Sequence, residues 1–294
     1  MTQPDNQRQL LADVLATFAR CPDARLRQIM EAVVRHLHQL VAEVGLTREE
    51  WATAVAFLTT VGNTCDYRRQ EFVLLSDTLG VSSLVEMVNY PDTPGATENT
   101  VMGPFYVPGS PERGLGESIV VDEGSGEPLV VSGTVRSLDG TPLPGATLDI
   151  WETAASGRYA VQDPDGQHAE NLRGVFRAGA GGHFEFRAVR PVVYSIPDDG
   201  PVGQMLRATG RHPMRAAHVH VRVSAPGHRE LITHLFDADS DYLDSDAVFG
   251  VRRSLVVAFK RNEAGDLAAR FDVILTPDSI MPASMSPSEK PQSS

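Results

Sequence analysis

The chain of 294 residues is short of cysteine, of basic charge and of long apolar runs, and each shortage excludes a class of protein. Its 2 cysteines, Cys21 and Cys65, are too few for a disulfide framework or a thiolate metal cluster. Lys and Arg number 26 against 38 Asp and Glu, and the net charge of -12 argues against nucleic acid or an anionic membrane as a partner. No run approaches the roughly 20 apolar residues of a membrane span. The N-terminus lacks the basic and apolar regions of a signal peptide, so we expect a cytoplasmic protein.

The first part of the chain has the apolar period of helices. Apolar residues recur at i, i+3 and i+4 between Gln9 and Val44, which predicts amphipathic helices. The stretch "TREE", Thr47 to Glu50, is typical of a capping box that opens another helix. Ser83, three residues before Glu86, suggests a further helix start. We therefore expect a helical region over residues 1–100.

The second part has the short, β-branched runs of strands, separated by turn residues. These runs are "LVVSGTVRS", "ATLDIW", "HFEFRAV", "HVHVRVSA", "ELITHLFD" and "SLVVAF". They predict an antiparallel β-sandwich of about eight strands over residues 101–276, with long functional loops. Residues 277–294 are Ser- and Pro-rich and are expected to be disordered. The predicted fold class is α+β.

One predicted strand, "HVHVRVSA", carries two histidines on the same side. Residues i and i+2 of a strand point the same way, so His218 and His220 project together while Val219, Val221 and Val223 face the core. The alternative is a pair of surface histidines on an edge strand. Two imidazoles within an apolar strand need compensation for lost hydration, and a metal supplies it.

Two tyrosines at strand ends are the other candidate ligands, Tyr159 in "WETAASGRY" and Tyr194 in "RPVVYSIPDDGPVG". Each alone is typical of a half-buried core aromatic with a bonded hydroxyl. Beside two histidines the interpretation changes, because phenolate is a hard oxygen donor that suits ferric iron. A tyrosine, with a reference pKa of about 10, ionises at neutral pH only beside a strong positive charge. The absence of HExxH leaves a zinc protease unsupported.

The chain resembles the intradiol ring-cleavage dioxygenases, which include catechol, chlorocatechol and hydroxyquinol 1,2-dioxygenases. The resemblance covers nearly the whole chain and rests on "TENTVMGPFY", "GTVRSLDGTPLPGATLDIWETAASGRY", "NLRGVF", "YSIPDDGPVG" and "MRAAHVHV". "GRHPMRAAH" and "DYLDSDAVFGV" are most similar to the hydroxyquinol (benzene-1,2,4-triol) branch, whose product is maleylacetate. The alternatives are a catechol-type enzyme that gives cis,cis-muconates and a non-catalytic, transthyretin-like sandwich that binds aromatics.

The resemblance implies a role for each residue of the site. Tyr159 and His218 would stay on Fe(III), and Tyr194 and His220 would be its axial ligands, with Tyr194 leaving to take a proton from the diol. Arg215 would stabilise negative charge near the ring, although most arginines form surface ion pairs. The residues implied at the ring are Leu74, Asp77, Gly103, Pro104, Phe105, Ile196, Pro197 and Val248.

Three implied features reach beyond the ligand set. Asp77 would accept a hydrogen bond from a third substrate hydroxyl, although its position alone favours a helix-end cap. His234 stands where the catechol enzymes commonly have Gln; it is not counted as a ligand, but it bears on substrate choice. The N-terminal helices imply a homodimer that encloses a phospholipid.

Overall fold

The computed structural model describes residues 4–280 except 68 and 125. Contacts divide the chain into two compact units, residues 1–63 and 64–294, which are described separately. Of the tail expected to be disordered, residues 281–294 lie outside the described part, while Asp278–Ile280 form a turn of 3-10 helix. No helix among the described residues is long and apolar enough to cross a membrane.

The first unit is helical, as the apolar period predicts. Asp23 caps the second helix by accepting hydrogen bonds from the backbone N–H groups of Arg25 and Leu26. The predicted capping box is confirmed: Thr47 N–H donates to Glu50 Oε2 at 2.9 Å, and Glu50 N–H donates to Thr47 Oγ1 at 3.2 Å. The helices are α1 (Asp5–Thr17), α2 (Ala24–Val44) and α3 (Arg48–Thr64), of which the last residue falls in the second unit.

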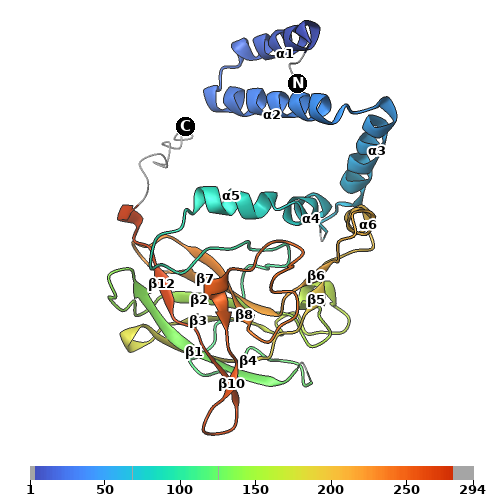
Figure 1. Cartoon of the computed structure of the whole chain (residues 1–294). Helices are drawn as coiled ribbons and strands as arrows, with labels where there is room; N and C mark the ends of the chain where they lie inside the picture. The colour runs from blue at the N-terminus through green and yellow to red at the C-terminus, as the bar shows by residue number, and fades with distance from the viewer. Residues whose placement is uncertain (1–3, 68, 125, 281–294) are drawn as a thin grey trace. The chain divides into compact units, whose positions relative to one another are not determined.

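Two further helices, α4 (Glu71–Thr78) and α5 (Val81–Asn89), belong to the second unit and lie beside its sheets (Figure 1). The short helix predicted at "SLVEMV" is confirmed, but Ser83 is not its first residue, because α5 begins at Val81. The Ser83 hydroxyl instead donates to the carbonyls of Val248 and Phe249, at 3.2 and 3.3 Å. Ser83 thereby ties α5 to a loop expected near the site. A sixth helix, α6, spans Pro201–Ala208.

The strands form two five-stranded sheets and one two-stranded sheet (Figure 1). In the first sheet the order is β10-β11-β1-β12, and β4 also pairs with β1; in the second it is β3-β2-β7-β8-β9; the small sheet pairs β5 with β6. The bounds are β1 Pro128–Ser137, β2 Thr147–Trp151, β3 Arg173–Arg177, β4 His183–Val189, β5 Tyr194–Ser195, β6 Met214–Arg215, β7 His218–Ser224, β8 Leu231–Asp237, β9 Val256–Val257, β10 Lys260–Arg261, β11 Leu267–Arg270 and β12 Val273–Leu275.

The two large sheets share one core, which confirms the α+β class and the sandwich. Val131 and Phe186 of the first sheet and Ile150, Val219 and Val221 of the second belong to one buried cluster. The expectation of purely antiparallel sheets is corrected: β1 runs parallel to β11 and β12, and β8 runs parallel to β9. Long connections such as residues 238–255 let a chain return in the same direction, which a tight hairpin cannot do.

Candidate functional site

The site begins on β7, where the alternation of the strand separates two kinds of side chain. Val219, Val221 and Val223 lie in the sandwich core, as expected. His218 and His220 project from the other face and are each only 2% exposed. The edge-strand alternative is therefore excluded, because β7 lies between β2 and β8 and buries both imidazoles.

Tyr159 reaches the histidines through the turn that follows β2. The register places Trp151, the last residue of β2, opposite His220. Gly157 then turns the chain with φ of +74°, and a Cβ there would lie 3.1 Å from Cβ of Tyr194. The turn thus brings the two tyrosines together, and Tyr159 Oη lies 2.9 Å from Nε2 of His220.

Tyr194 and Arg215 are held opposite each other by the small β5–β6 sheet. Arg215 Nη1 donates to Tyr194 Oη at 3.1 Å and lies 3.1 Å from Nε2 of His218. Tyr194 Oη lies 3.2 Å from Tyr159 Oη, and the Nε2 atoms of His218 and His220 lie 3.2 Å apart. Two phenol oxygens and two imidazole nitrogens therefore meet at one buried point.

The hydrogen bonds of His218 show that this point can hold a metal. Its Nδ1 lies 2.6 Å from the carbonyl oxygen of Ala216, which only accepts, so Nδ1 carries the proton. The lone pair of Nε2 then faces the site, which is the orientation of a metal-binding imidazole. Burial, aided by the charge of Arg215, lowers the pKa of His218 well below its usual value and keeps the ring neutral.

Without a cation, the same surroundings disfavour a tyrosinate. Burial, reinforced by Tyr194, raises the pKa of Tyr159 well above its ordinary value. For His220, burial followed by the proximity of His218 lowers the pKa. Neutral imidazoles and phenols that ionise only beside strong positive charge fit a highly charged, oxygen-preferring metal ion.

A buried ion pair fixes Arg215. Its Nε lies 3.1 Å from Asp246 Oδ1 and its Nη2 lies 3.4 Å from Asp246 Oδ2, and the two side chains are 4% and 2% exposed. Asp246 Oδ2 also accepts the backbone N–H of Gly250 at 2.8 Å. Burial opposes the charged form of Arg215, but the carboxylate of Asp246 outweighs it and raises the pKa. Sequence reasoning missed Asp246, because nothing local distinguishes it from the other acids of "DYLDSDAVFGV".

Two of the residues expected at the ring contact the ligand set. Phe105 stacks on Tyr159 with centroids 5.1 Å apart. Gly103 has φ of +75°, and a Cβ there would lie 3.5 Å from the ring of His220. Of the others, Leu74, Ile196 and Val248 are buried, Pro197 is half-buried and Pro104 is exposed, and their contact with a substrate stays a prediction.

Asp77 lies in the last turn of α4 and is 4% exposed. Burial raises the pKa of its carboxyl, while a hydrogen bond with Ser82 and the charge of Arg215 act in the opposite direction. The influence of Arg215 places Asp77 within electrostatic reach of the ligand set. Its role toward a substrate hydroxyl stays a prediction.

His234 lies beside the ligand set. The β7–β8 register places it directly opposite His220, with ring centroids 4.2 Å apart. One possible ligand atom from each of His218, His220 and His234 lies within 4.8 Å of the others. Trp151 is stacked on the other side of His220, with centroids 4.6 Å apart and planes 11° apart. Strand register places Trp151 and His234 on either side of His220, and this register cannot be read from the sequence.

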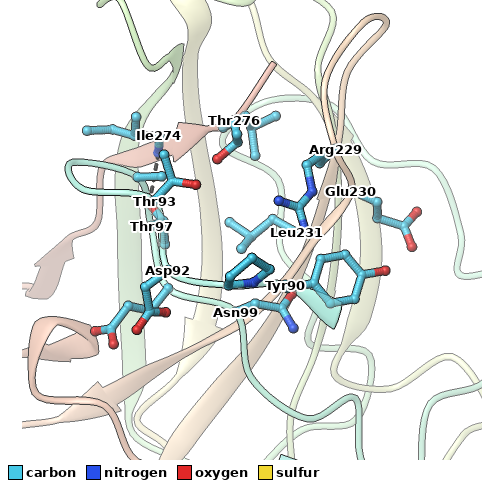
Figure 2. A pocket seen from close by; sticks show the side chains of 14 residues that line it. Tyr90, Asp92, Thr93, Thr97, Asn99, Arg229, Glu230, Leu231, Ile274 and Thr276 are labelled. Atoms are coloured by element: carbon cyan, nitrogen blue, oxygen red, sulfur yellow. Dashed lines mark hydrogen bonds between the residues drawn. The ribbon is translucent and has the colours of Figure 1, made fainter. Parts of the chain in front are cut away.

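A separate small pocket lies between the chain entering the sandwich and the strands β8 and β12 (Figure 2). Its cavity measures about 50 Å³, and Tyr90, Thr97, Asn99, Arg229 and Ile274 are among its lining residues. None of the residues expected at the site lines it. This pocket is too small for an aromatic substrate. Hydrogen bonds along its sides hold residues 97–100 in place.

Comparison with known proteins gives two family matches that together cover most of the chain. The family model described as "Dioxygenase" matches residues 101–277, and "Catechol dioxygenase N terminus" matches residues 23–97. The chain is 50% identical over 250 residues to a hydroxyquinol 1,2-dioxygenase of Rhizobium sp. (strain MTP-10005), covering 85% of this chain and 84% of the relative.

Two further relatives align over nearly their whole length. A 6-chlorohydroxyquinol 1,2-dioxygenase of Cupriavidus pinatubonensis is 46% identical, with 94% of this chain and 99% of the relative covered. The crystal structure of a hydroxyquinol 1,2-dioxygenase from Pseudomonas putida DLL-E4 matches with a TM-score of 0.88 and 44% identity, covering 93% and 99% of the two chains.

Proposed function

Because the chain belongs to the intradiol ring-cleavage dioxygenase family, we propose that it opens the ring of hydroxyquinol with dioxygen at a site that holds Fe(III). The product would be maleylacetate, the keto form of 3-hydroxy-cis,cis-muconate. The observation that carries the proposal is the convergence of Tyr159 Oη, Tyr194 Oη and the Nε2 atoms of His218 and His220. The relatives' names support hydroxyquinol as the substrate.

These four side chains would hold the iron through Oη of Tyr159 and Tyr194 and Nε2 of His218 and His220. Bound there, Fe(III) supplies Lewis acidity and a template for the ionised diol. Tyr194 would accept a proton from a substrate hydroxyl at its Oη, which lies 3.2 Å from Tyr159 Oη and accepts a hydrogen bond from Arg215 Nη1 at 3.1 Å.

Arg215 is the fixed positive charge of the site. Asp246 holds two of its nitrogens, so Nη1 is left aimed at Tyr194 Oη and His218 Nε2. A donor pre-oriented in this way stabilises negative charge on the ring as the reaction proceeds, without a cost in reorientation at that moment. The uncharged wall of the proposed substrate pocket would consist of Leu74, Gly103, Pro104, Phe105, Ile196, Pro197 and Val248.

Asp77 is proposed to select the third hydroxyl of hydroxyquinol, which catechol lacks. Its carboxyl is almost fully buried, and a buried polar group needs a partner. A substrate hydroxyl would add a hydrogen bond to the one with Ser82, whereas catechol would leave this further acceptor position of the carboxyl unfilled. Pockets built around such a hydrogen bond discriminate strongly against the analogue that lacks the hydroxyl.

The direct test is oxygen uptake by purified, iron-loaded protein with hydroxyquinol and with catechol. We expect a broad visible band from tyrosinate-to-iron charge transfer, a higher kcat/KM on hydroxyquinol and maleylacetate as the product. Tyr159→Phe should remove most of the colour and the turnover. A colourless protein that binds zinc would refute the iron site and favour a non-catalytic aromatic binder. Faster turnover of catechol would instead assign the chain to catechol-type enzymes.

A homodimer through the N-terminal helices is also proposed. Eight large apolar residues of α2 are at least one-third exposed at helical spacing, namely Leu26, Ile29, Met30, Val33, Leu37, Leu40, Val41 and Val44. Such a stripe calls for a partner surface. Between α1 and α2 there is a cavity of about 460 Å³ lined by Leu10, Val41, Leu46 and others, which supports a bound phospholipid. Light scattering tests the dimer, and mass spectrometry of an organic extract tests the lipid.

A further inference from the structure

His234 is a fully buried polar side chain whose hydrogen bonds are only half made. It is 0% exposed, and its Nδ1 lies 2.5 Å from Oγ1 of Thr100. Within the described residues its Nε2 has no hydrogen-bond partner. Buried polar nitrogens in proteins almost always have one, so an unpartnered nitrogen beside the candidate metal site indicates a group that a ligand satisfies.

The position of His234 is fixed by strand pairing. It stands opposite His220 on the face that carries His218, and its ring centroid is 4.7 Å from that of His218. The imidazole thus borders the metal-binding nitrogens from the β8 side. His234 shares its face of β8 with Phe236, whose ring centroid lies 5.2 Å away, so packing alone does not distinguish its role and the unpartnered Nε2 carries the argument.

Thr100 is also firmly placed, although it lies in an irregular segment. Its backbone N–H donates to the carbonyl of Ile232 at 2.7 Å. Figure 2 shows this segment beside β8 and β12, where Thr97 exchanges hydrogen bonds with Ile274 and Asn99 accepts the N–H of Ile232. These hydrogen bonds to strands β8 and β12 therefore hold the segment in place and keep the Thr100 hydroxyl next to His234.

The contact between Thr100 Oγ1 and Nδ1 of His234 fits donation in either direction, and the two distances at Thr100 favour the tautomer with the proton on Nε2. The hydroxyl has one hydrogen to donate, and its acceptors are Nδ1 of His234 at 2.5 Å and the carbonyl of Ile232 at 3.5 Å. The nearer and stronger acceptor is Nδ1. A neutral imidazole that accepts at Nδ1 carries its hydrogen on Nε2, so Nε2 is a donor without a lone pair for a metal ion.

We propose that His234 is a catalytic residue: Nε2–H, kept in that tautomer by Thr100, donates a hydrogen bond to an oxygen atom of the bound diol. This inference rests on the proposed function and extends it. His234 is then neither a third histidine ligand of the metal nor a packing residue. A donor at this place favours the ionised form of the diol oxygen, because hydrogen bonds to charged acceptors are the stronger ones.

The test compares two pairs of variants on iron-loaded protein, with iron per chain and the anaerobic Kd of hydroxyquinol as readouts. His234→Leu removes the donor, and His234→Gln keeps an N–H near Nε2. Thr100→Val removes the hydroxyl at nearly constant volume, and Thr100→Ser is its control. We expect iron content to be unchanged throughout. The Kd should rise by about tenfold to a hundredfold in His234→Leu, less in Thr100→Val, and little in the Gln and Ser variants.

Every other outcome contradicts the proposal in a distinct way. Loss of iron in His234→Leu would make His234 a ligand, and an unchanged Kd in both His234→Leu and Thr100→Val would make it a packing residue. If His234→Leu does not fold, the Kd of Thr100→Val against that of Thr100→Ser distinguishes a donor from a packing residue. Failure of the wild-type protein to bind iron or hydroxyquinol would refute the proposed function instead.

Discussion

Asp246→Asn should damage stability and turnover together, because it removes the charge that balances Arg215. The pair is almost fully buried, with side chains 4% and 2% exposed. Removing one partner of a buried pair leaves an uncompensated charge and costs about 3–5 kcal/mol. Asparagine has the same shape, and while its oxygen accepts the N–H of Gly250 its NH2 group faces Nε of Arg215, donor to donor, so the loss reports the missing charge together with the lost hydrogen bond.

In Asp246→Asn the turnover number kcat should also fall, because Arg215 is no longer held in one position by the carboxylate. Its Nη1 lies 3.1 Å from both Tyr194 Oη and His218 Nε2 only while Asp246 holds the other side of the guanidinium. Loss of one pre-oriented donor to developing charge costs about 10²–10³ in kcat. We therefore expect a fall of that order with hydroxyquinol, and a smaller change in KM.

Urea denaturation gives the free energy of unfolding, and oxygen uptake gives kcat. The matched control is Asp244→Asn in the same loop, where the acid is exposed and its loss should change stability by less than about 0.5 kcal/mol. Equal effects of the two variants on stability would refute the buried ion pair. A destabilised Asp246→Asn with normal kcat would refute the role of Arg215 in catalysis.

Three further predictions concern substitutions of single residues. Burial raises the pKa of Glu152 from 4.5 to about 8. Since the folded form keeps its proton longer than the unfolded form, stability should fall by about 1.4 kcal/mol per pH unit between those values, and Glu152→Gln should flatten this slope in denaturation series. Gly103→Ala should lower the free energy of unfolding by about 1–2 kcal/mol, because φ is +75°, while the new Cβ at 3.5 Å from the His220 ring makes only an ordinary contact; urea denaturation would show the loss, and unchanged stability would contradict it. Asp77→Asn should lower kcat/KM for hydroxyquinol more than for catechol, and equal losses on both substrates would argue against its role in selection.

How much of the fold was predictable differs between its parts. The helices followed from apolar period and from caps such as Thr47 with Glu50, because both signals are local. The parallel pairing of β8 with β9 could not be predicted from local patterns, because it joins two segments separated by a long loop. The helix at Ser83 was predicted, but the contacts of its hydroxyl were not, for the same reason: Val248 and Phe249 lie far along the chain.

The site divides in the same way. The sequence alone determined that His218 and His220 share a face and that Tyr159, Tyr194 and Arg215 are their candidate partners, because side-chain alternation and motif spacing are written in the order of residues. Only the tertiary structure decided that Asp246 balances Arg215 and that Thr100 orients His234 opposite His220. Those contacts depend on strand register and loop closure, in which residues distant along the chain meet, and no local pattern encodes them.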